Sequence, residues 1–258
     1  MAGGKRPVAL VTGARRGIGA ATCIALAAGG YDILAVDKEL EGARETGRAV
    51  VEAGGDFDFR FCDLADPGAL APLADWAWAM GGGVEAVVSN AGIGTQQRGD
   101  PLDLTPESWD QVMAVNTRAP FFLTQSLARR MVAEDAPLRG PRGIVFITSA
   151  NAVLASPDRA DYCASKAALS MLARCFALRL AEAGIPVFEL RPGVIRTAMT
   201  APVAERYTQR IADGLSPLRR WGEAEDVARA VAGLLSGAIP FSTGDAFHVD
   251  GGLHIGRL

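Results

Sequence analysis

Two residues in the second half of the chain could together move a proton at an oxygen atom. Tyr162 and Lys166 are four residues apart, which would place a phenol and an ammonium group on one face of a helix. A phenol loses its proton only at about pH 10, but a nearby cation lowers that pKa, so the pair could act as a general acid/base. Tyr–Lys pairs also occur on the surface of ordinary helices, and the spacing alone does not separate the two interpretations.

Ser149 is a third candidate, because it directly follows an apolar segment, residues 143–148, that we expect to be a strand. Ligands of doubly wound sheets bind at the carboxyl ends of the strands. A hydroxyl group at that edge could hold and polarise a substrate oxygen. The same residue would also serve as a turn residue or a helix N-cap.

A glycine turn near the N-terminus predicts an anion site. The sequence Thr-Gly-Ala-Arg-Arg-Gly-Ile-Gly, residues 12–19, lies between an apolar segment and a helix rich in alanine and leucine. Gly13, Gly17 and Gly19 would let the backbone approach a pyrophosphate at the positive end of the helix dipole. Glycines are also common in ordinary tight turns between a strand and a helix.

The elements that must position these residues alternate along the chain. Apolar segments typical of strands lie at 8–11, 32–36, 57–62, 86–88, 143–148, 186–190 and 246–249, and helical patterns lie at 20–28, 39–52, 67–80, 106–132, 162–183 and 223–235. Such alternation is typical of βαβ units. We expect an α/β fold: one doubly wound, Rossmann-type domain over residues 1–258, with about seven parallel strands flanked by helices on both faces. The pattern weakens at 197–220, which we expect to be a mobile substrate-binding segment.

Composition excludes several classes of function. The 258 residues are 49% hydrophobic and 21% charged, and the net charge of −3 without a basic cluster argues against nucleic acid or an anionic membrane as a partner. Four cysteines without paired spacing indicate reduced thiols, and two histidines are too few for a zinc site, so we expect no metal. Without a signal peptide or a membrane-spanning segment, a cytoplasmic location is expected.

The combined motifs resemble the classical form of the short-chain dehydrogenase/reductase (SDR) family. The glycine turn is followed, in the family's order, by residues 89–92, Asn116, Ser149, Tyr162 with Lys166, and 192–193. The resemblance implies that Tyr162 is the general acid/base and that Ser149 orients the substrate oxygen. It further implies that Lys166 binds the nicotinamide ribose and lowers the tyrosine pKa, and that Asn116 holds a water molecule in a proton relay.

The same resemblance implies a nicotinamide dinucleotide cofactor and its contacts. These are Gly13, Arg16, Gly17, Ile18 and Gly19 at the phosphates, Asp37 at the adenosine ribose, Asp63 and Leu64 at the adenine, Asn90, Ala91 and Gly92 beside the ribose, Tyr162 and Lys166 at the nicotinamide ribose, and Pro192, Gly193, Ile195 and Thr197 at the nicotinamide. Ser89 replaces the asparagine that is commoner in the family.

The choice between NAD and NADP rests on opposing charges. Asp37, at the end of the second predicted strand, would accept hydrogen bonds from the ribose hydroxyls and repel a 2′-phosphate. Arg16 and Lys38 would attract that phosphate, although both, with Arg15, are also consistent with solvated surface charge. We expect NAD, because the carboxylate would touch the discriminating atoms, and NADP stays possible.

The sequence therefore predicts an oxidoreductase that transfers a hydride between NAD(H) and a secondary alcohol or ketone, such as a small polar alcohol, a sugar or a hydroxy acid. One alternative is a 3-oxoacyl-(acyl-carrier-protein) reductase using NADPH. For that, Arg139 and Arg142 would have to meet the acidic carrier, while Ala183 is not basic where such reductases often are. A catalytically silent, cofactor-sensing protein is the other alternative to the predicted function. The predicted helices 106–132 and 161–183 carry apolar residues on more than one face, which indicates a partner surface. The resemblance implies that these two helices form dimers and that the final strand with residues 251–252 forms tetramers, so a homotetramer is expected.

Overall fold

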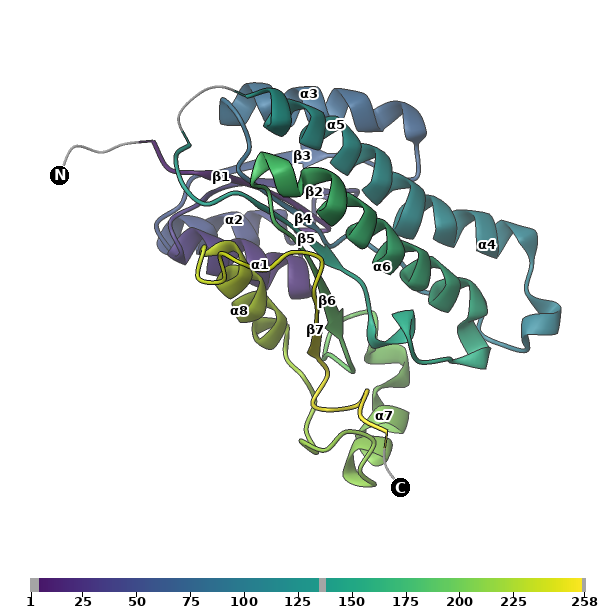
Figure 1. Ribbon diagram of the computed structural model, residues 1–258. Coiled ribbons are helices and arrows are strands. Elements are labelled where there is room, and N and C mark those ends of the chain that lie inside the picture. The colour runs from purple at the N-terminus through teal and green to yellow at the C-terminus, as the bar shows by residue number, and fades with distance from the viewer. Residues whose placement is uncertain (1–4, 135–137, 257–258) are drawn as a thin grey trace.

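Seven parallel strands form a single sheet at the centre of the computed structural model, which describes residues 5–134 and 138–256 (Figure 1). The strands are β1 (Val8–Thr12), β2 (Asp32–Asp37), β3 (Phe57–Phe61), β4 (Ala86–Ser89), β5 (Gly143–Ile147), β6 (Val187–Pro192) and β7 (Ala246–Val249). Their order is β3-β2-β1-β4-β5-β6-β7, and every neighbouring pair is parallel. The predicted seven-stranded, doubly wound sheet is confirmed.

Helices cover both faces of the sheet, because successive strand residues point to opposite sides. Val8 and Leu10 of β1 face one apolar core, which they share with α3 (Leu70–Gly81), α5 (Ala119–Ala133) and α6 (Ala160–Leu180). Ala9 and Val11 face the other core, shared with α1 (Gly17–Ala28), α2 (Ala43–Glu52) and α8 (Ala224–Leu235). Strand order reverses between β1 and β4, which creates the topological switch point where such folds bind ligands.

The helix predicted over 106–132 is interrupted. The structure has α4 (Pro106–Met113), a π-helical turn (Ala114–Arg118) and then α5. Pro120 has no N–H, so the α-helical hydrogen bond from residue 120 to the Asn116 carbonyl cannot form, and the chain takes a wider turn there. The interruption falls on a predicted catalytic residue.

Other boundaries differ for local reasons. α2 begins at Ala43 rather than Glu39, because Gly42 adopts φ = +84° and Glu39 is used in an ion pair. A short helix, α7 (Ala204–Ala212), lies within the segment whose sequence pattern was weak. The prolines, glycine and arginines of residues 135–142 predict a loop, of which residues 135–137 lie outside the described residues. Among the described residues, no helix is both long and apolar enough to cross a membrane.

Candidate active site

A cleft of about 880 Å³ lies over the carboxyl ends of the central strands. It extends from the glycine turn after β1 and the end of β2, past β4 and β5, to the loop after β6 and α7. Most predicted site residues line it: Gly13, Arg16, Gly17, Ile18, Gly19, Asp37, Leu64, Asn90, Ala91, Gly92, Ser149, Tyr162, Lys166, Pro192, Gly193, Ile195 and Thr197. Only Asp63 and Asn116 among the predicted residues do not.

The glycine turn forms a cradle that side chains would fill. Gly13 has φ = +66°, and a Cβ atom there would lie 2.9 Å from the Ala91 Cα. A Cβ on Gly19 would collide with the Gly13 carbonyl oxygen. The Asn90 amide donates to the carbonyls of Thr12 (2.9 Å) and Gly13 (3.1 Å), so this side chain holds the turn. Backbone N–H groups at the start of α1 are therefore open to a pyrophosphate, and the turn fits a dinucleotide.

The adenosine end of the cleft contains a buried arginine whose role the sequence did not reveal. The Arg15 guanidinium is 8% exposed and forms ion pairs with Asp37 (3.5 Å) and Glu39 (2.5 Å), and its backbone N–H donates to the Asp37 carboxylate (3.3 Å). The interpretation of Arg15 as solvated charge is wrong, because two carboxylates compensate its burial. Arg16 is exposed and lines the cleft. Asp37 is thus held in place where a ribose would bind.

Asp63 does not meet the cleft. Its side chain is exposed and accepts a hydrogen bond from the backbone N–H of Ala65 (2.9 Å). Its neighbours Cys62 and Leu64 line the cleft instead. An adenine contact at this position would therefore be made by apolar side chains.

Three side chains from β5 and α6 meet at the middle of the cleft. Tyr162 and Ser149 are each 8% exposed, both line the cleft, and the Ser149 hydroxyl is close enough to influence the titration of Tyr162. Lys166, one helical turn after Tyr162, is 3% exposed and donates to the carbonyl of Ile147 at 3.0 Å. Asp161 accepts from the Tyr162 backbone N–H (2.7 Å) and from Ser108 (2.7 Å), which fixes the start of α6.

Burial shifts the pKa values of both Tyr162 and Lys166. Burial raises the pKa of Tyr162 above its usual value, and the Ser149 hydroxyl and the charge of Arg159 only partly oppose the increase. The Lys166 ammonium nitrogen lies 5.8 Å from the tyrosine ring centroid and donates to a backbone carbonyl. That Lys166 lowers the tyrosine pKa when the cofactor is bound stays a prediction. Burial lowers the pKa of Lys166 itself to about 8, against the opposing charge of Glu189. In this state Tyr162 is a proton donor at neutral pH.

Asn116 lies behind the cleft and is fully buried. Its side-chain oxygen accepts from the N–H of Ile93 (2.8 Å), and its amide donates to the Ile93 carbonyl (2.9 Å) and to Ser165 (3.1 Å). The side chain therefore braces the 92–93 loop against α6. A Cβ on Gly92 would lie 3.3 Å from both the Asn116 side-chain oxygen and the Lys166 ammonium, so this packing depends on a glycine.

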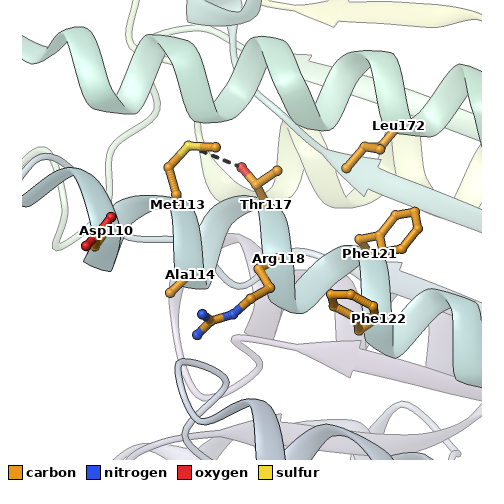
Figure 2. Close-up of a pocket in the computed structure, with 8 residues that line it drawn as sticks. All are labelled: Asp110, Met113, Ala114, Thr117, Arg118, Phe121, Phe122 and Leu172. Carbon is orange, nitrogen blue, oxygen red and sulfur yellow. Dashed lines mark hydrogen bonds between the residues drawn. The ribbon is translucent and has the colours of Figure 1, made fainter.

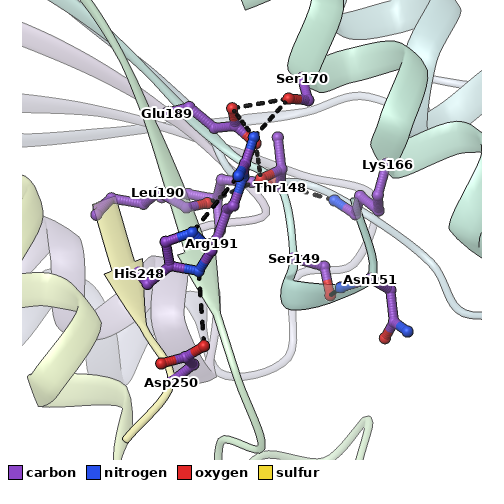
Figure 3. Close-up of polar contacts among 11 residues, drawn as sticks. Thr148, Ser149, Asn151, Lys166, Ser170, Glu189, Leu190, Arg191, His248 and Asp250 are labelled. Carbon is purple, nitrogen blue, oxygen red and sulfur yellow. Dashed lines mark hydrogen bonds and ion pairs between the residues drawn. The ribbon is translucent and has the colours of Figure 1, made fainter. Parts of the chain in front are cut away.

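A buried ion pair lies beside Ser149 and Lys166, as Figure 3 shows. Glu189 on β6 pairs with Arg191 (2.8 Å) and accepts hydrogen bonds from Thr148 (2.6 Å) and Ser170 (2.8 Å). Thr148 precedes Ser149, and Ser170 lies one helical turn beyond Lys166. Burial raises the pKa of Glu189, but its hydrogen bonds outweigh burial, so the pKa is lowered. The sequence carries a signal for this pair that could have identified it, namely two charged residues within an otherwise apolar strand.

Beyond Arg191, the two histidines meet at the C-terminal segment. His254 Nδ1 lies 2.8 Å and His248 Nδ1 3.6 Å from the Asp250 carboxylate, and the two rings stack at 3.8 Å. Such a trio can ligate a metal, although the sequence pointed to none. A metal-bound histidine usually donates its other ring N–H to a hydrogen-bond acceptor. Here Nε2 of His248 instead faces the Arg191 guanidinium at 3.5 Å, and a guanidinium can only donate. Asp250 also accepts the backbone N–H groups of Gly252 and His254, which fixes this turn.

Fold and site together define a nicotinamide-dependent oxidoreductase of the Rossmann type, and comparison with known proteins agrees. The chain matches the family model described as enoyl-(acyl carrier protein) reductase over residues 13–254. It is 34% identical over 255 residues to 3beta-hydroxysteroid dehydrogenase 1 of Eggerthella lenta, covering 96% of this chain and 94% of the relative. The chain belongs to the short-chain dehydrogenase/reductase family and is an NAD(P)-dependent enzyme of that family.

Solved structures with the same fold include enzymes of different specificity. A 3-oxoacyl-[acyl-carrier protein] reductase from Brucella melitensis in complex with NAD is 47% identical, with a TM-score of 0.95 over 99% of this chain and 100% of that one. A gluconate 5-dehydrogenase from Burkholderia cenocepacia in complex with NADP and tartrate is 31% identical, with a TM-score of 0.86 over 96% and 94% of the two chains. This chain is thus similar both to an enzyme of acyl-carrier substrates and to one of sugar acids.

Proposed function

We propose that this protein transfers a hydride between NAD(H) and a secondary alcohol or its ketone. The observation that supports it best is that Ser149, Tyr162 and buried Lys166 line the middle of one cleft whose far end is the glycine cradle. This arrangement puts a proton donor and acceptor next to the place where a nicotinamide ring would lie. A silent, cofactor-sensing protein would have no need of this group.

When bound, the nicotinamide supplies or accepts the hydride. In ketone reduction, the Tyr162 hydroxyl gives its proton to the carbonyl oxygen, and in alcohol oxidation the phenolate takes the proton back. Ser149 donates a hydrogen bond to the same oxygen and stabilises the charge that develops on it. Lys166 would hold the ribose hydroxyls, and Asn116 would brace the loop beside it and hold a relay water. The segment 197–220 would cover the substrate.

A panel assay tests this proposal. The purified enzyme is offered small polar alcohols, sugars and hydroxy acids, each with NAD and with NADP, and reduced nicotinamide is followed by absorbance. We expect at least one secondary alcohol to be oxidised, with NAD as the better cofactor. No turnover with any alcohol or corresponding ketone, despite measurable NADH binding, would favour a cofactor-sensing protein instead.

NAD preference follows from the position of Asp37 beside Arg15. Removing the carboxylate in Asp37→Ala leaves Arg15 paired with Glu39 alone, so that Arg15, Arg16 and Lys38 together would attract a 2′-phosphate. We expect the ratio of kcat/KM for NADP to that for NAD to rise by at least about tenfold, since a like charge in a poorly solvated cleft is removed. Asp58→Ala, an exposed carboxylate on the neighbouring strand, is the matched control. A parent enzyme that already prefers NADP would contradict the assignment.

A 3-oxoacyl-(acyl-carrier-protein) reductase is the second candidate, favoured by the 47% identity to the Brucella melitensis enzyme. The basic residues considered for the carrier do not support it. Arg139 is paired with Glu85 (2.7 Å), and Arg142 donates to the Met131 carbonyl (3.0 Å). Both precede β5, at the amino ends of the parallel strands and opposite the cleft. Turnover of an acyl-carrier thioester at a higher kcat/KM than any free alcohol or ketone would establish this alternative.

Association into a homo-oligomer is part of the proposal. The outer surface of α5 and α6 carries Phe122 (46% exposed) and Met171 (56% exposed), while Leu123, Leu127 and Leu169 of the same helices pack on the sheet. Figure 2 shows Phe121, Phe122 and Leu172 around a hollow on this outer surface. A single apolar stripe would suffice for a helix that only covers a sheet. The four unpaired cysteines fit a cytoplasmic location.

Light scattering of the purified protein measures this association directly. We expect a mass about four times the chain mass of 26.9 kDa at micromolar concentration. Phe122→Glu, which puts a charge on the exposed apolar surface, should lower the mass to that of a smaller species. Observation of the 26.9 kDa species alone in the parent protein would refute the oligomer.

A further inference from the structure

Positive and negative charges are divided between the two ends of the cleft. Its only carboxylates among the described lining residues, Asp37 and Glu39, lie at the adenosine end. The other end, lined by parts of residues 94–98, 149–159 and 199–215, is called the substrate end here. It contains Arg98, Arg159 and Arg210 and no carboxylate among the residues that line it.

Arg159 is the arginine that lies against the catalytic group. Its guanidinium carbon is 5.4 Å from the centroid of the Tyr162 ring. The group donates to the hydroxyl oxygens of Ser156 (3.2 Å) and Tyr207 (3.3 Å), which are both neutral. None of the ion pairs formed by the described residues includes Arg159. A half-buried cation is thus held in place by a ring and two hydroxyls.

Of the other two arginines at this end, Arg98 differs from Arg159 in this respect. Arg210 also lacks a carboxylate within ion-pair distance among the described residues, but it is exposed and its guanidinium carbon lies 5.9 Å from the centroid of the Tyr207 ring. Arg98 pairs with Asp158 at 2.8 Å, and Asp158 also accepts from Ser156 and lies 3.9 Å from Arg206. Asp158 adjoins Arg159 in sequence, yet its carboxylate is directed to Arg98. The Arg159 charge also helps to lower the pKa of Asp158, but no carboxylate of the described residues lies within ion-pair distance of the Arg159 guanidinium. The guanidinium can therefore accept an anion as a direct partner in the cleft.

We propose that Arg159 binds a carboxylate group of the substrate, so that the enzyme acts on a hydroxy acid and the matching oxo acid. The inference rests on the proposed function and specifies its substrate class. A guanidinium can bind both carboxylate oxygens in a fork geometry, which would orient the rest of the molecule. Since Arg159 lies over the Tyr162 ring, the bound acid would place its carbinol carbon near the tyrosine hydroxyl.

An acyl thioester would bind less favourably to Arg159. The oxygen atoms around the reacting carbonyl of a 3-oxoacyl thioester are uncharged, and the acidic groups of a carrier protein would stay outside the cleft. A neutral sugar or steroid would likewise leave the cation uncompensated. Among the substrate classes considered, a free acid is the one that supplies the missing charge.

Matched pairs of compounds test the inference with NAD as the cofactor. The pairs are D-gluconate with glucitol, and 3-hydroxybutyrate with its methyl ester. In the parent enzyme we expect a higher kcat/KM for the acid of each pair that is turned over. Arg159→Gln should lower the acid-to-neutral ratio of kcat/KM by about 10- to 100-fold, mainly through KM, because a charge-assisted hydrogen bond is lost. Arg159→Lys, which keeps the positive charge, should recover part of the acid-to-neutral ratio.

Arg206→Gln is the matched control, because it removes an exposed arginine near the mouth that does not line the cleft. Arg206→Gln should leave the acid-to-neutral ratio of kcat/KM unchanged. Calorimetry of tartrate binding to the enzyme–NADH complex gives a readout independent of turnover, and the Kd should rise in Arg159→Gln by a similar factor.

The outcomes separate the two proposals. Turnover of neutral alcohols with equal ratios in the parent and in Arg159→Gln would overturn the carboxylate site and leave the oxidoreductase proposal intact. Absence of turnover for every compound, with an Arg159-dependent Kd for tartrate, would support the carboxylate site and count against the proposed reaction. A tartrate Kd unaffected by Arg159→Gln would overturn the site whatever the activity.

Discussion

Tyr162→Phe should lose nearly all turnover while keeping its fold and its affinity for NADH. The phenylalanine ring fills the same space beside Arg159 and Lys166, but it has no proton to give or accept. General acid/base groups contribute about 10²- to 10⁴-fold, so kcat should fall by that factor. The measurement is steady-state turnover of the best compound in the panel, with NADH binding followed by fluorescence.

Tyr31→Phe is the control for loss of a phenol hydroxyl. The Tyr31 hydroxyl donates to the carbonyls of Pro141 (3.0 Å) and Leu235 (2.9 Å), far from the cleft. Its removal should change the free energy of unfolding but not kcat. If kcat of Tyr162→Phe stays within a factor of a few of the parent value, Tyr162 is not the acid/base.

Glu189→Gln is expected to destabilise the fold by about 3 kcal/mol, because it leaves the Arg191 charge buried and unpaired. Arg191 is 6% exposed and Glu189 is 1% exposed, so water cannot replace the lost partner. The double variant Glu189→Gln/Arg191→Met removes both charges and should be less destabilised than the single one. Urea unfolding of the three proteins measures the difference. A single variant that unfolds at the parent's urea concentration would contradict this account of the pair.

The same carboxylate gives the stability a defined pH dependence. The pKa of Glu189 is lowered in the folded protein, so its contribution is fully present above the pKa of an unfolded glutamate. It is lost as the pH falls through the lower, folded pKa. Glu189→Gln should therefore lose less stability than the parent over this acidic range, which urea unfolding at several pH values would reveal.

The fold and the central site residues were predictable because they depend on local patterns. Apolar segments alternating with helices give the sheet, and the Gly13 to Gly19 turn follows from backbone geometry. Tyr162 and Lys166 share a helix, so their spacing alone brings them together. Ser149 reaches them because parallel strands end at one edge of the sheet.

What the sequence did not reveal depends on contacts between distant segments. Arg15 is buried because Asp37 and Glu39, on another element, surround it, and a string of basic residues looks the same when solvated. Asp63 is absent from the lining of the cleft, and its carboxylate accepts the N–H of Ala65. The lack of a carboxylate partner for Arg159 could be known only once Asp158 was seen to pair with Arg98.

Transfer of deuterium from the cofactor tests the central claim most directly. The enzyme is mixed with NADH deuterated at the nicotinamide C4 position that it uses and with the ketone of its best alcohol substrate, and the product is analysed by mass spectrometry. Hydride transfer places deuterium on the carbinol carbon of the product in the parent enzyme, and the yield in Tyr162→Phe should be lower by about 10²- to 10⁴-fold. Alcohol formed without deuterium from either C4 position, or no alcohol from any ketone tested, would contradict the proposed reaction.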